Sequence, residues 1–184
     1  MMKRFLKDTR GNFSIIFTIL AMIAVSVIMA MSGILRQNFV LNEVQGVMDM
    51  AGVGALRMSV ELEPAKEDEF IFKHEVAESY FNQTMDKHIQ PGSYIKYTNS
   101  QVIDINNSLY ESGPGAIGYS RQVWMDTVTM IRVESSFLFD LFPGLEKRFY
   151  DAYSDENFTV SLGGIREDGQ RELIIRSVSR VIFH

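Results

Sequence analysis

The sequence predicts an α+β protein, with a long amino-terminal transmembrane helix that extends into a domain containing an antiparallel sheet. Three observations lead to this prediction. Residues 11–35 contain no charged side chain. Residues 36–62 keep apolar side chains at helical spacing, and no proline occurs before Pro64. The remainder of the 184-residue chain contains several β-rich segments separated by turn residues, a pattern typical of a sheet with an accompanying helix.

Residues 12–35 are expected to cross the membrane. A helix of about 20 apolar residues spans the hydrocarbon core, and all its backbone groups bond within the segment. A secretory signal is one alternative, but its apolar region is only about 7–15 residues long. A buried helix of a soluble protein is the other, and such a helix is rarely apolar on every side over this length. The transmembrane interpretation therefore fits best.

A basic leader, residues 1–11, precedes this segment. Its basic residues are Lys3, Arg4, Lys7 and Arg10, opposed only by Asp8. Clustered Lys and Arg stay on the cytoplasmic side of a membrane. From Leu62 onward, acidic residues outnumber basic ones. We therefore expect a single-pass protein of the cytoplasmic (inner) membrane, with its amino end inside and its carboxyl-terminal domain outside.

The helix is expected to continue beyond the bilayer through residues 36–62. Its apolar side chains form a stripe with spacings of three and four, a pattern close to a heptad seam: Val40, Val44, Val47, Ala51, Ala55, Met58 and Leu62. A single helix over residues 12–62 would be about 75 Å long. The stripe either packs on the chain's own domain or packs against other copies or other helices, and both can hold on different turns. Glycines among these residues would allow a close approach of another backbone.

Residues 63–184 are predicted to form the extracytoplasmic α+β domain. A charged joint containing Pro64 ends the long helix. A second amphipathic helix is expected before Pro91, with an apolar face formed by Phe70, Phe72, Val76, Tyr80, Phe81 and Met85. Strands are predicted over residues 94–105, within 122–139, and over 158–162 and 172–183. Residues 112–115 are expected to form a loop, and residues 137–144 an apolar stretch broken by a turn.

The residues point to no catalytic centre, metal site or cofactor. The chain has no cysteine, which excludes thiolate ligands and thiol nucleophiles. His74 and Glu78 lie one helical turn apart, but a zinc-binding helix of this kind needs a second histidine. The glycines at 113, 115 and 118 lack the lysine of a phosphate-binding loop and indicate a surface loop. We expect a protein that is not an enzyme.

Two further observations concern partners. The formal net charge of −5 argues against a nucleic-acid partner. Four aromatic residues either belong to the core or form an exposed assembly patch: Trp124, Phe137, Phe139 and Phe142.

The layout resembles a known family. The string from Arg10 to Phe17 reads Arg-Gly-Asn-Phe-Ser-Ile-Ile-Phe, and it opens an apolar helix after a short basic leader. Residues 45–56, with Asp49, Ala51 and Ala55, are similar to a Gln-Ala-Ala-Asp-Ala-Ala-type helix continuation. Together with the aromatic Phe-Pro-Gly segment within residues 128–145 and the final strand, these features resemble the TadE/TadG-like pseudopilins, or minor pilins, of tight-adherence (Flp) type IV pili.

This resemblance implies a pilin-like fold and a possible processing site. A prepilin peptidase would cut after Gly11 and leave Asn12 as the new amino terminus. Pilin-like members carry a glutamate five residues after the cut and a tyrosine next to it, whereas this chain has Ile16 and Phe17. A glutamate at that depth is costly in lipid unless it is paired. Its absence favours an anchored assembly partner over a major filament subunit.

Two hypotheses follow. In the first, the chain is a non-enzymatic component of a tight-adherence pilus or a related secretion assembly. It would act through helix packing and through its outer domain, with the lipid bilayer and other pilus-assembly membrane proteins as partners. In the second, it is a membrane-anchored binding or sensory domain of the cell envelope, unrelated to pili.

Overall fold

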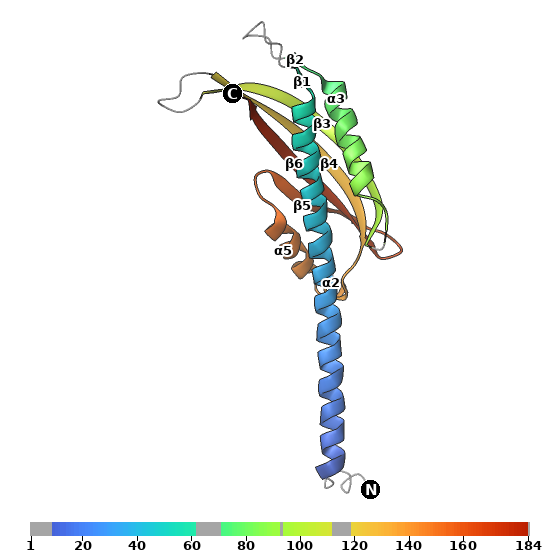
Figure 1. Ribbon diagram of the computed structural model, residues 1–184. Coiled ribbons are helices and arrows are strands. Elements are labelled where there is room, and N and C mark those ends of the chain that lie inside the picture. The colour runs from blue at the N-terminus through green and yellow to red at the C-terminus, as the bar shows by residue number, and fades with distance from the viewer. Residues whose placement is uncertain (1–8, 62–70, 93, 112–118, 184) are drawn as a thin grey trace.

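The computed structural model describes residues 9–61, 71–92, 94–111 and 119–183. It contains one long helix and a four-stranded antiparallel sheet (Figure 1), which confirms the α+β class. The helices are α2 (Thr9–Met58), α3 (His74–His88), α4 (Phe137–Leu141) and α5 (Pro143–Tyr153). The strands are β1 (Val60–Glu61), β2 (Ile71–Phe72), β3 (Ile95–Glu111), β4 (Tyr119–Glu134), β5 (Phe158–Ile165) and β6 (Gln170–Phe183).

The main sheet has the strand order β3-β4-β6-β5, and every neighbouring pair is antiparallel. Its two faces differ because successive side chains of a strand point to opposite sides. From Val123 to Val133 and from Arg171 to Val181, the odd-numbered residues of β4 and β6 are buried. The even-numbered residues between them are at least partly exposed, except Asp126, which Arg176 pairs with. Only the odd-numbered face therefore carries a hydrophobic layer.

The carboxyl-terminal half of α2 covers that face and contributes its own buried side chains to the core. It crosses the sheet over β4 and β6, α3 lies beside it next to β3, and α5 packs on β5 (Figure 1). Among the largest fully buried side chains, Leu41, Met48 and Leu56 come from α2, Phe81 and Met85 from α3, and Met125, Ile131, Leu173 and Ile175 from the sheet. The core is thus a sandwich of two helices on one sheet face.

The long helix is continuous, as expected, but it ends at Met58 rather than at Leu62. The next residue, Ser59, is buried and donates its hydroxyl to the Leu56 carbonyl. Its own carbonyl accepts from the backbone of Lys73, and β1 then pairs with β2. Leu62 and the charged joint that follows it lie outside the described residues.

The second helix is present, but its buried face is not entirely the predicted one. Phe81 and Met85 are buried together with Ala77, whereas Val76 and Tyr80 are more than a third exposed. Phe70, predicted on the same face, lies outside the described residues.

Residues 137–144 were predicted as an apolar stretch with a turn, and this prediction missed two helices. The five-residue α4 is followed at once by α5, which begins at Pro143. Proline is favoured at the first helical position because its fixed φ suits the helix and its missing N–H costs no bond there. Phe149, Tyr150 and Tyr153 then return at helical spacing, a signal that would have identified α5.

Candidate membrane interface

Along most of its length, the amino-terminal half of α2 has no other described part of the chain beside it (Figure 1). Every residue from Phe13 to Met29 is exposed, and Phe13 and Phe17 are 73% and 66% exposed. Its most apolar 18-residue window has a mean hydropathy of 2.6, and only 6% of that window is buried. By length and composition, α2 is the one described helix able to cross a membrane.

From Ala30 onward the helix contacts the domain. Ala30 is buried, and the start of α4 lies directly against Gly33. A Cβ at Gly33 would lie 2.6 Å from Ser136 Oγ, so glycine is what permits this approach. The last turns of the predicted span, residues 30–35, therefore lie beside α4.

The predicted packing stripe faces the chain's own sheet. Val40, Val44, Ala51 and Ala55 are buried in the core, and Val47 is partly buried against it. Met58 departs from the stripe, since it is 62% exposed. The buried face follows the helical period of 3.6 residues instead, which puts Leu56 and Ser59 at its end. Leu62 lies outside the described residues. The buried members of the stripe leave no room there for another copy.

A close backbone approach and a hydrogen bond hold α2 on the sheet near the carboxyl-terminal end of the helix. A Cβ at Gly52 would meet Ser179 Oγ at 2.0 Å, so helix and strand β6 are closer here than a side chain allows. One turn earlier, Asp49 accepts a hydrogen bond of 3.1 Å from the Ser177 hydroxyl. The Asp49 carboxylate, part of the string that resembles pilin-like helices, thus serves an internal contact.

A hydrogen-bonded cluster marks the level at which α2 enters the domain. Gln37 is buried, donates to the Glu134 carbonyl at 3.1 Å and accepts from the Tyr150 hydroxyl at 2.8 Å. Burial raises the pKa of Tyr150 well above its ordinary value, and the nearby Glu146 adds to the rise while Arg171 opposes it. The phenol therefore stays protonated and can always donate. Sequence patterns gave no signal for this cluster, because its members are far apart in the chain.

A second cluster, on the sheet side of α4 and α5, holds these helices in place. Arg171, at the start of β6, is 5% exposed and donates to Glu146 of α5 at 2.9 Å and to Asp140 of α4 at 2.7 Å. Glu146 is itself buried. A buried charge is tolerated only when it is paired and hydrogen-bonded, so one guanidinium ties both short helices to the sheet.

The outer side of α4 and α5 is apolar and exposed. We call this surface the apolar corner, and define it by Phe137, Leu141, Phe142 and Leu145, which are 40–61% exposed. Phe139 is buried and anchors the corner in the core. Of the four aromatic residues noted in the sequence, two are thus exposed here, Phe139 is core and Trp124 is partly buried. An open groove of about 500 Å³ separates Phe137 and Leu138 from α2, where Ile23, Val27 and Ala30 line it.

Aromatic and charged side chains also meet at the level of Arg36 on α2. The Arg36 guanidinium pairs with Glu134 at 3.0 Å and lies 5.3 Å from the centre of the Tyr94 ring. Tyr94 in turn contacts Phe39 edge-on. Arg36 is the first charged residue after Arg10. The end of the uncharged stretch therefore coincides with a cluster formed by Arg36, Tyr94 and Phe39, which we call the Arg36 cluster.

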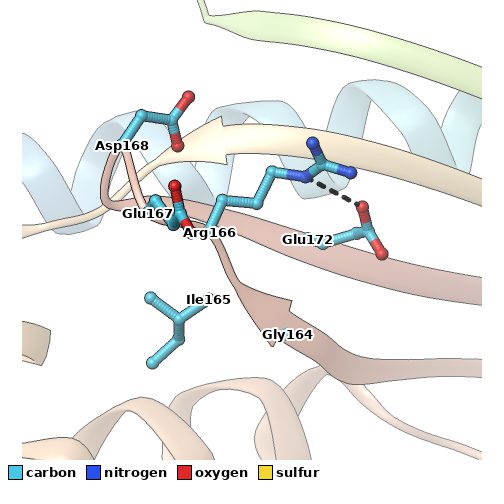
Figure 2. A pocket seen from close by; sticks show the side chains of 6 residues that line it. All are labelled: Gly164, Ile165, Arg166, Glu167, Asp168 and Glu172. Atoms are coloured by element: carbon cyan, nitrogen blue, oxygen red, sulfur yellow. Dashed lines mark ion pairs between the residues drawn. The ribbon is translucent and has the colours of Figure 1, made fainter.

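Another hollow is at the turn between β5 and β6 (Figure 2) and involves Gly164, Ile165, Arg166, Glu167, Asp168 and Glu172. The Arg166 side chain points to Glu172 at 3.6 Å, and Asp168 accepts from the backbone of Gln170. These contacts stabilise a tight turn, and the hollow contains neither histidine nor serine to act as base or nucleophile.

The remaining residues singled out in the sequence lie away from these clusters. Arg10, Gly11 and Asn12 lie in the first turns of α2, whereas Lys3, Arg4 and Lys7 lie outside the described residues. His74 opens α3 with its ring edge-on to Phe72. In the described part of the chain, no group of three or more His, Cys, Asp or Glu could hold a metal ion.

Comparison of the chain with protein-family models, with curated proteins and with solved structures found no significant match. The similarity to TadE/TadG-like pilus-assembly proteins therefore rests on the residues quoted from the sequence, and it stays a prediction.

Proposed function

We propose that this chain is a single-pass membrane protein whose outer domain is carried on the end of its own membrane helix. One observation carries this proposal: residues 13–29 of α2 are exposed and apolar on every side, while the same helix continues as the core of the domain. Exposing so much apolar surface to water is unfavourable by about 25 cal/mol per Å². Lipid removes that cost. The basic leader supports an orientation with the amino end in the cytoplasm.

Within that membrane, the proposed role is that of a non-enzymatic pseudopilin or minor pilin-like component of a tight-adherence pilus or a related secretion assembly. A long helix with a bare amino-terminal half and a sheet-covered carboxyl-terminal half fits the pilin-like architecture that the resemblance implies. Because the domain already covers the stripe of residues 40–55, contacts with other pilus-assembly proteins would use the exposed half of α2.

Photo-crosslinking in cell membranes tests this role. A photoreactive amino acid at Phe17, on the exposed half, is expected to give discrete adducts with other small single-pass membrane proteins, identified by mass spectrometry. The same amino acid at Met58, exposed at the far end of the helix, serves as the matched control and should give none of these adducts. Adducts with lipid alone at Phe17 would contradict the assembly role and favour an anchored binding or sensory domain.

The mass of the mature protein extracted from its membrane tests processing. A loss equal to residues 1–11 would establish cleavage between Gly11 and Asn12 by a prepilin peptidase. An intact mass would establish a permanently anchored protein.

A further inference from the structure

We propose that the apolar corner is a second lipid-contacting site, which inserts into the outer boundary of the bilayer beside α2 and seats the domain on the membrane surface. This inference rests on the proposed membrane insertion of α2 and deepens it. The occupant would be the acyl chains and glycerol region of the outer leaflet. The four side chains of the corner, Phe137, Leu141, Phe142 and Leu145, would be the inserting groups.

The length of the bare helix places the corner at this depth. The uncharged stretch before α2 meets the domain, residues 11–29, measures about 28 Å at 1.5 Å per residue. The hydrocarbon core of a bilayer is about 30 Å thick. The uncharged stretch is therefore just long enough to cross the core and leaves no extra helical turn between the bilayer and the domain. The helix is buried at Ala30, and the residue before α4 lies directly against Gly33. If the helix spans the bilayer, α4 meets the membrane surface.

The composition of the corner suits that surface. Phe137, Leu141 and Phe142 are all more than half exposed; the first two lie on α4, and Phe142 links α4 to α5. The groove beside Phe137 and Leu138 is lined on the α2 side by apolar residues of the span, among them Ile23 and Val27. Amphipathic elements at membrane surfaces bury such side chains about 5–10 Å into the boundary between headgroups and acyl chains. Lipid would cover both the corner and the groove.

The polar side chains near the apolar corner are also placed as expected for a corner that lies at the membrane surface. Asp140 lies on α4 among the apolar residues, but its carboxylate pairs with Arg171 of the sheet at 2.7 Å. Tyr94 and Arg36 lie about one helical turn beyond Gly33 along α2, where tyrosine and arginine are favoured at the headgroup level. The order along the helix axis is thus the apolar corner first, then the Arg36 cluster, then the polar body of the domain.

The corner is also rigidly supported. Phe139 packs against Phe149 and Tyr150 in the core, and Arg171 holds both short helices through Asp140 and Glu146. A preorganised surface of this kind binds without the cost of ordering a flexible loop. The exposed side chains therefore keep a fixed height relative to α2.

Site-directed spin labelling of the full chain tests the proposal, and the absence of cysteine in the sequence makes single-cysteine variants straightforward. Four variants are compared in vesicles of phosphatidylethanolamine and phosphatidylglycerol: Phe142→Cys and Leu141→Cys at the corner, Ile23→Cys within the span, and Met58→Cys at the far end of α2. The measurement is the accessibility of each label to oxygen, which concentrates in lipid, relative to a water-soluble nickel chelate. Trp124 fluorescence verifies that each variant is folded.

The labels at Phe142 and Leu141 are expected to shift towards the lipid value of Ile23 and away from the aqueous value of Met58. A lipid value at Ile23 with aqueous values at both corner positions would overturn the second site and leave the anchor intact. An aqueous value at Ile23 would overturn the anchor itself. Corner labels shielded from both reagents would mean that a protein covers the corner, which would also overturn the proposal.

Discussion

The two halves of α2 share one helix but differ in how their apolar residues are distributed around it. Residues 13–29 are all exposed, although Phe137 and Leu138 approach Ile23 and Val27 across a groove, whereas from Gln37 to Leu56 the helix is buried along one face. On the buried half, polar residues such as Asn42 and Glu43 occupy the outer face. The distribution of apolar residues around the axis, rather than their number, therefore indicates whether a helix is matched to lipid or to its own domain.

The largest effect is expected from charging the bare half. In the double variant Ile19→Asp/Ile23→Asp, each carboxylate near the middle of the span costs about 2.5–3.5 kcal/mol of insertion free energy. The variant should leave the carbonate-resistant membrane fraction, as measured by immunoblotting after alkaline extraction. Met58→Asp, which adds a charge to an exposed position on the other half, should stay in that fraction. Retention of the double variant would argue that α2 does not span the bilayer.

The second largest effect is a loss of domain stability, expected when a core residue of the buried half is truncated. Leu41→Ala should destabilise the domain by about 2–5 kcal/mol, because it opens a cavity at a fully buried position. Denaturant unfolding of the full chain in detergent micelles, followed by Trp124 fluorescence, measures the change. The control is Phe39→Ala, two residues away and 58% exposed, which should cost far less. Equal losses in both variants would show that the two faces of this half do not differ as described.

The smallest change in the free energy of unfolding is expected from replacing single glycines in the buried half. Gly52→Ala should cost about 1–3 kcal/mol, because the new methyl group would overlap Ser179. Gly46→Ala meets nothing within 4 Å and should stabilise the helix by up to about 1 kcal/mol. The same unfolding assay measures both. A double variant, Gly52→Ala/Ser179→Gly, should recover part of the loss, and a failure to recover would place the strain elsewhere.

Local sequence patterns predicted the elements whose signal is contained within one segment. The uncharged run, the periodic continuation of the helix and the alternating strands all led to the correct class, because each depends only on spacing along the chain. The end of the helix was misplaced by four residues, since the apolar Met58 continues the spacing that Ser59 actually breaks. Tyr80 was misassigned for the same reason: apolar character alone does not say which side of a helix meets a sheet.

The apolar corner and its supports could not be predicted in this way. Gln37 meets Tyr150 across 113 positions of the chain, and Arg171 of β6 meets Glu146 of α5 across 25 positions that include all of β5. Such pairs depend on the tertiary arrangement of strands, which a single sequence does not specify. Only α5 left a local signature, in Pro143 and the aromatic spacing after it.

The uninterrupted helix also has a mechanical consequence. α2 is helical from Thr9 to Met58 with no break, and Arg36 and Gln37 attach it to the end of β4 just where it enters the domain. A force or torque applied to its amino-terminal half is therefore transmitted directly to the sheet, because no flexible linker separates the two. Any tilt of the helix would swing the far end of the domain through a large arc, so a small change in the angle of the amino-terminal half would become a large displacement of that far end.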